Sequence, residues 1–215
     1  NTAIGVGTAL SNKANTGIVA LGFNALRNAD DRAIGRISGN TAVGYESLKG
    51  SSTPANNTGQ YNTALGANSL PENTSGSDNS AIGFQTMLSN TTGNSNVAVG
   101  NSALKLNTTA SNNTALGFNT LSKNTTGYSN TAVGYQAMAN AKSDINNVLM
   151  IGVFAGYGVQ ASSNVGIGNN SMASQMTGIY NTAVGNATLE STLSGSRNSA
   201  LGHAALQYNT SGDNN

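Results

Sequence analysis

The chain has 215 residues and a formal net charge of +1, and only 8% of its residues are charged, against roughly 25% in a typical soluble domain. It has no Cys and a single His, which excludes disulfides and Cys-containing metal sites. Near-zero net charge gives no electrostatic footprint for nucleic acid. The sequence contains no uninterrupted apolar run of about 18 residues, the length that a helix needs to span a bilayer. We therefore predict no nucleic-acid partner, no membrane insertion, no metal site and no cofactor.

A motif of the form Asn-Thr-Ala-aliphatic-Gly recurs along the whole chain, as at 113–117, 130–134 and 181–185. Its glycine marks twelve copies, which are 16 to 18 residues apart except for two spacings of 22. The twelve glycines are Gly5, Gly22, Gly44, Gly66, Gly83, Gly100, Gly117, Gly134, Gly152, Gly168, Gly185 and Gly202. An aliphatic residue precedes each glycine, and Leu or Met follows four positions later in ten of the twelve copies. Such self-similarity at a fixed period indicates a repeat architecture.

Each repeat is too rich in Gly and Asn for a helix interior. The alternation in Thr-Ala-aliphatic-Gly instead predicts a strand with Thr and the aliphatic residue on one face and Ala and Gly on the other. The Asn-Thr-Thr-Gly segments at 90–93 and 124–127 predict turns in which Asn bonds its own backbone and Gly takes a positive φ. We therefore predict an all-β protein, a β-solenoid or β-roll of about 12 coils with a 17-residue period. Each coil would hold two very short strands, and stacked Asn and Thr columns would form side-chain ladders.

One such ribbon has little apolar material with which to fold alone. Each coil supplies about one aliphatic residue, one Leu or Met and one Ala. Burying a large aliphatic side chain contributes roughly 1.5–3 kcal/mol, whereas ordering each residue costs roughly 1–2 kcal/mol. We therefore expect self-association, most simply a homotrimeric fibre of intertwined or side-by-side ribbons, on the order of 55–60 Å long at about 4.8 Å per coil.

In chain order, the repeat is first interrupted by insertions near 27–39 and 49–61, which lie in consecutive coils and should be neighbours on one side of the rod. The first insertion concentrates charge, and loops carried by a rigid scaffold often bind partners. We predict a lateral binding patch there, with a solvated bulge held by internal ion pairs as the alternative. Its candidate residues are Asp30, Asp31, Arg32, Arg36, Asn56 and Asn57.

The third irregularity, an apolar coil at 142–160, is interpreted as a locally thicker core, with a partner-docking patch as the alternative. His203 lies at a repeat position that is also occupied by Tyr45, Phe84, Phe118 and Tyr135, so we assign it no catalytic role. Asp30 and Asp31 are adjacent and would face opposite ways in a strand. We predict no catalytic residues and no enzyme activity.

The segment Asn-Thr-Ala-Val-Gly-Tyr-Gln-Ala-Met at 130–138, with its Asn-Thr-Thr-Gly spacers, resembles the shaft repeats of phage tail fibres and related Bacteroidota surface proteins. In such proteins the repeats often precede a self-cleaving chaperone domain. The Ala-aliphatic-Gly core also resembles the head repeats of trimeric autotransporter adhesins, whose period is nearer 14 residues. The resemblance covers nearly the whole of the repeat domain, 1–215, which we expect to be one segment of a longer fibrous chain.

This resemblance implies a fibre on the virion surface that attaches a phage to a glycan or protein receptor on the host cell. The alternative is a trimeric bacterial surface adhesin, extracellular or on the cell surface. Two weaker alternatives follow from the residues themselves. The column Thr41, Thr63, Thr114, Thr131 and Thr182 suggests an ice-binding solenoid, and the aliphatic-Gly-x-x-small motif suggests a hexapeptide-type acyltransferase with 18 residues per coil.

Overall fold

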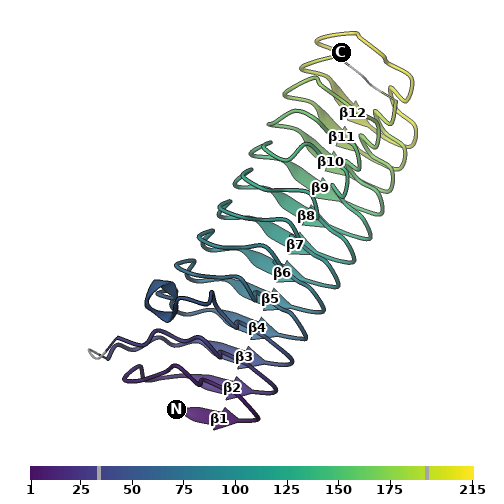
Figure 1. The fold of residues 1–215 in the computed structure, drawn as a ribbon. Helices are drawn as coiled ribbons and strands as arrows, with labels where there is room; N and C mark the ends of the chain where they lie inside the picture. Colours follow the sequence, from purple (N-terminus) through teal and green to yellow (C-terminus); the bar gives the residue numbers. More distant parts are fainter. Residues whose placement is uncertain (33–34, 192–193) are drawn as a thin grey trace.

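A computed structural model of the chain describes residues 1–32, 35–191 and 194–215. Twelve three-residue strands stack along a rod as one parallel sheet in the order of the chain (Figure 1). They are β1 (Thr2–Ile4), β2 (Val19–Leu21), β3 (Thr41–Val43), β4 (Thr63–Leu65), β5 (Ser80–Ile82), β6 (Val97–Val99), β7 (Thr114–Leu116), β8 (Thr131–Val133), β9 (Leu149–Ile151), β10 (Val165–Ile167), β11 (Thr182–Val184) and β12 (Ser199–Leu201). A 3₁₀ turn, η1 (Pro54–Asn56), lies between β3 and β4. The prediction of an all-β solenoid of about 12 coils is confirmed.

Residues at equivalent positions of the repeat pair with one another across the sheet. Ala98 of β6 pairs with Ala81 of β5 and Ala115 of β7, and the same alignment joins every neighbouring pair of strands. It persists through the 22-residue spacings, where Ala42 still pairs with Ala20 and Ala64. The insertions therefore bulge out of the coil without shifting the strands.

The expectation of two strands per coil is wrong for the described residues, where each coil has one. The segment after each strand alternates its backbone between ordinary and left-handed conformations, which a strand does not allow. We number each coil by its strand. In coil 6, for example, Ser102 and Leu104 have φ values of 59° and 49°. This segment still bonds to its neighbours, since the N–H of Leu104 donates to the carbonyl of Thr120 at 3.0 Å.

The interior of the rod combines small apolar residues with buried amides. The central Ala of most strands is buried, and so is the Leu or Met four residues after the strand glycine in every coil that has one except the last, where Leu206 is exposed. Beside them run two columns of buried Asn, which confirm the predicted Asn ladders. The stacked Thr residues of the turns instead donate to backbone carbonyls, as the hydroxyl of Thr91 does to the carbonyl of Thr108 at 3.1 Å. In one column Asn79 donates to Asn62 at 3.1 Å and Asn96 donates to Asn79 at 3.1 Å. In the other, Asn90 donates to Asn73 at 2.9 Å.

Two kinds of glycine allow the coils to approach closely. Gly117, which follows β7, has a φ of 135°, and a Cβ on it would lie 2.4 Å from the carbonyl oxygen of Gly134. Gly93 of the turn does not have a positive φ, so the reason predicted for the turn glycines is wrong. A Cβ on Gly93 would lie 2.3 Å from the carbonyl oxygen of Ala110, so glycine is favoured there by contact between coils.

The irregular coil at 142–160 keeps its strand in register while its core is rearranged. Met150 takes the inward strand position that Ala occupies in most coils, and it is fully buried. Gly156 stands where other coils have Leu or Met, and Gly166 replaces the strand Ala of the next coil. A Cβ on Gly156 or Gly166 would lie 2.6 Å or 2.5 Å from the Met150 side chain. Met150 thus fills the space from the strand side.

Candidate functional site

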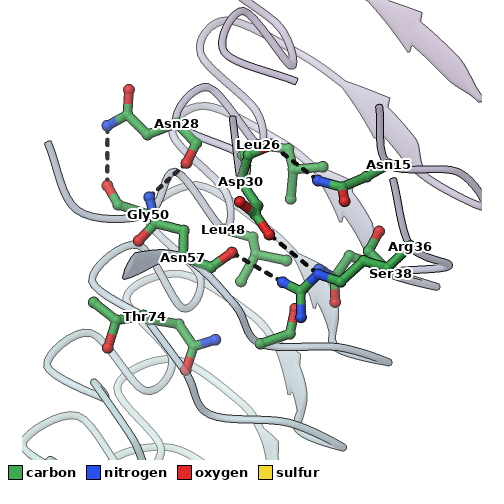
Figure 2. Close-up of a pocket in the computed structure, with 14 residues that line it drawn as sticks. Asn15, Leu26, Asn28, Asp30, Arg36, Ser38, Leu48, Gly50, Asn57 and Thr74 are labelled. Atoms are coloured by element: carbon green, nitrogen blue, oxygen red, sulfur yellow. Dashed lines mark hydrogen bonds and ion pairs between the residues drawn. The ribbon is translucent and has the colours of Figure 1, made fainter. Parts of the chain in front are cut away.

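The charged residues of the first insertion form an internal ion-pair cluster. Asp30 is only 2% exposed and accepts hydrogen bonds from the Nε of Arg32 at 2.9 Å. The Nε of Arg36 lies 3.2 Å from the same carboxylate (Figure 2). The hydrogen bond from Arg32, together with the positive charges of both arginines, lowers the pKa of Asp30 against the opposing effect of burial. Asp30 is therefore an ionised structural anchor.

The second insertion closes over the first, so their predicted adjacency is confirmed. The side-chain amide of Asn57 donates to the carbonyl of Asn28, and Arg36 donates to the carbonyl of Asn57 at 3.4 Å. Both insertions project from the same side of the rod (Figure 1). Between them lies a cavity of about 20 Å³, lined by Asp30, Arg36 and Asn57 among others (Figure 2). This is enough for about one water molecule and not for a ligand.

The predicted binding residues thus fall into two groups, those that join the insertions and those that remain accessible. Asp30, Arg36 and Asn57 meet and are used to join the two insertions. Asp31, whose carboxylate lies 4.0 Å from the Nζ of Lys13, is half-buried, while Arg32 and Asn56 are exposed. A lateral binding patch at the insertions stays a prediction, and it would rest on these last three residues.

The other sequence candidates can be placed as well. His203 is exposed directly after the glycine that follows β12, in the column predicted for it. Within the described ranges there is no group of three His, Cys, Asp or Glu side chains that could hold a metal ion. No helix in that part of the chain is long and apolar enough to cross a membrane.

An apolar face runs along the sheet. We define it as the last residue of each strand together with Phe23, Tyr45, Phe84, Phe118 and Tyr135, which follow strand glycines. Every one of these side chains is exposed or half-buried, from Ile4 to Leu201. Phe23 stacks on Tyr45, and Phe118 stacks on Tyr135, each at 5.4 Å between ring centres. A solvent-accessible apolar column that recurs at every coil is typical of an interaction surface.

The alternation of the repeat predicts the aliphatic column on the face opposite Ala, and the structure confirms it. The sequence assigns no function to the position shared by Tyr45, Phe84, Phe118 and Tyr135. Comparison of the chain with protein-family models, curated proteins and solved structures gave no match.

Proposed function

We propose that this chain is the shaft of a homotrimeric phage tail fibre that attaches the virion to a glycan or protein receptor on the host cell surface. The apolar face is the observation that carries the assembly. It runs the length of the rod on one side of a parallel sheet, so parallel copies can cover it in register at every coil. Because the core of each coil is thin, covering this face with other copies would contribute directly to stability.

Two features of the solenoid suit a fibre that is under tension. Each coil is bonded to the next through the sheet, the left-handed segment and the Asn columns, so the rod has hydrogen bonds along its axis on every side. These three sets of hydrogen bonds join neutral groups, so they depend little on salt. The attachment role rests on the sequence resemblance to tail-fibre shafts.

The assembly is tested by analytical ultracentrifugation. We expect a species with three times the 21.6 kDa mass of the chain. The double variant Ile82→Asp/Leu116→Asp places charges on the apolar face and should shift the mass toward one chain. Thr109→Asp, at an exposed turn position away from this face, is the matched control and should leave the mass unchanged. A monomeric parent chain would contradict the proposal.

The attachment role is tested by flow cytometry of the labelled protein on a panel of cultured Bacteroidota strains. We expect saturable binding to at least one strain, competed by unlabelled protein. A correctly assembled trimer that binds no strain would contradict the receptor role while leaving the structural one.

A further inference from the structure

A second hollow lies away from the insertions, along coils 6 to 9. It is a groove of about 320 Å³ with Lys105, Asn119, Lys123, Asn140 and Tyr157 in its lining. These residues follow their strand glycines by two, five or six positions, so none of them belongs to the apolar face. The groove therefore forms a separate surface beside the assembly face, and we call it the lysine groove.

The lysine groove carries uncompensated positive charge. Its lining contains two Lys and no carboxylate. Neither Lys105 nor Lys123 has an ion-pair partner among the described residues, and Lys123 donates to the side chain of Asn140. By contrast, Lys49 lies 3.1 Å from Glu46, and Lys142 lies 3.3 Å from Asp144.

A larger hollow of about 510 Å³ near the insertions, in the same part of the coil, contains charges of both signs. Its lining contains Arg27 and Lys49, together with Glu46 and Glu72. Its formal charges cancel, whereas those of the lysine groove do not. The lysine groove is thus the better place for an anion.

One end of the lysine groove is formed by an exposed aromatic ring that is held by other rings. Tyr157 packs edge-on against Phe154 at 5.8 Å, and Phe154 packs edge-on against Tyr135 at 5.5 Å. Tyr135 stacks on Phe118. An aromatic face carries partial negative charge and attracts the C–H groups on the apolar face of a sugar ring. Tyr157 therefore offers a preorganised stacking platform.

We infer that the lysine groove binds an acidic saccharide chain, in which Lys105 and Lys123 pair with carboxylate or sulfate groups. Asn119 and Asn140 supply amides that can bond sugar hydroxyls, and Tyr157 stacks on a ring. The inference rests on the proposed attachment function and names the chemistry of its receptor. An acidic peptide is disfavoured because backbone groups here already bond between coils, as the N–H of Leu106 does to the carbonyl of Ser122 at 3.1 Å, which leaves no sheet edge for β-strand addition.

The test is isothermal titration of the full chain with two acidic probes, trigalacturonate and a heparin-derived tetrasaccharide, and with neutral maltotriose. We expect at least one acidic probe to bind at least tenfold more tightly than maltotriose, and its affinity to fall with added salt. Lys105→Gln/Lys123→Gln and Tyr157→Ala should each weaken that binding at least tenfold. Lys142→Gln, at an exposed lysine outside the groove, should not change it.

Circular dichroism and the sedimentation mass of each variant show whether it still folds and assembles. The inference is overturned if neither acidic probe binds, if the double lysine variant binds unchanged, or if hexaglutamate binds as tightly as the saccharides. Its failure is distinct from that of the proposed function, because the groove lies within one chain while assembly and cell binding are measured separately.

Discussion

At the scale of single residues, each coil places a large apolar side chain in a conformation that such residues rarely adopt. Leu104, Leu121 and Met138 have φ values of 49°, 50° and 54° and are almost completely buried. The left-handed backbone costs roughly 1–2 kcal/mol, and burying the side chain contributes roughly 1.5–3 kcal/mol. Burial thus offsets the strain at each position. Sequence periodicity identifies these residues as a recurring apolar column but does not predict their backbone, because local propensity favours Gly or Asn at a positive φ.

Asp30 is the residue whose loss should be felt most among the charges. Asp30→Asn removes the carboxylate that holds Arg32 and Arg36 and leaves Arg36, which is partly buried, without its counter-charge. We expect a loss of about 1–3 kcal/mol in the free energy of unfolding, measured by chemical denaturation at pH 7. Asp144→Asn breaks the exposed pair with Lys142 and should cost less than about 1 kcal/mol.

The pH dependence of the same variant follows from the direction of the shift. The folded-state pKa of Asp30 is lowered, so its stabilising effect is complete above the unfolded value of about 3.9 and is lost as the pH falls through the folded pKa. The stability difference between the parent chain and Asp30→Asn should therefore be constant near neutral pH and shrink below about pH 4. An equal difference at pH 3 and pH 7 would contradict the ion-pair role.

At the scale of elements, the register of the strands was predictable, whereas the number of strands in each coil was not. The motif fixes which residues align, because a shift by one residue would turn every Ala outward. The predicted second strand of each coil is not formed, and the segment after the strand instead takes a positive φ at every second residue, as at Gly117, Asn119 and Leu121. In this segment the adjacent residues Thr120 and Leu121 are both buried, which the alternation of a strand would not give. A small polar residue such as Thr120 gives no sign of burial in the sequence, so the sequence does not distinguish the two backbones.

Coil 9 offers a direct test of how elements share the core. Met150→Ala should leave a cavity and cost about 2–5 kcal/mol, and Gly156→Met alone should clash with Met150 and cost about 1–3 kcal/mol. The double variant recreates the arrangement of the regular coils, where strand Ala faces Met at a φ near 50°. We expect its midpoint of chemical denaturation to return most of the way to that of the parent. A purely additive loss in the double-mutant cycle would show that the two positions do not share one space.

At the scale of the whole molecule, the repeat explains the low charge, since identical charges stacked about 4.8 Å apart would repel at every coil. Charges therefore occur where the period is broken or at variable positions such as Lys105 and Lys123. The ion pairs of the first insertion were predictable from local sequence, because Asp30 and Arg32 are near neighbours. The lysine groove was not, because it joins residues from four coils at positions without a motif.

A rod built from equivalent coils should tolerate the removal of one whole period. Deleting residues 84–100 joins Gly83 to Asn101 and keeps the 17-residue spacing to Gly117, so every column, including the apolar face, stays in register. Each coil contacts only its neighbours, so stability is approximately a sum over coils and interfaces. We expect this variant to unfold in one transition within a few degrees of the parent, about 2–4 °C for each kcal/mol lost, measured by circular dichroism. Deleting residues 84–92 alone removes half a period and should abolish protection from hydrogen exchange in the flanking coils. If the two deletions destabilise the protein equally, the coils are not the independent structural units that the repeat indicates.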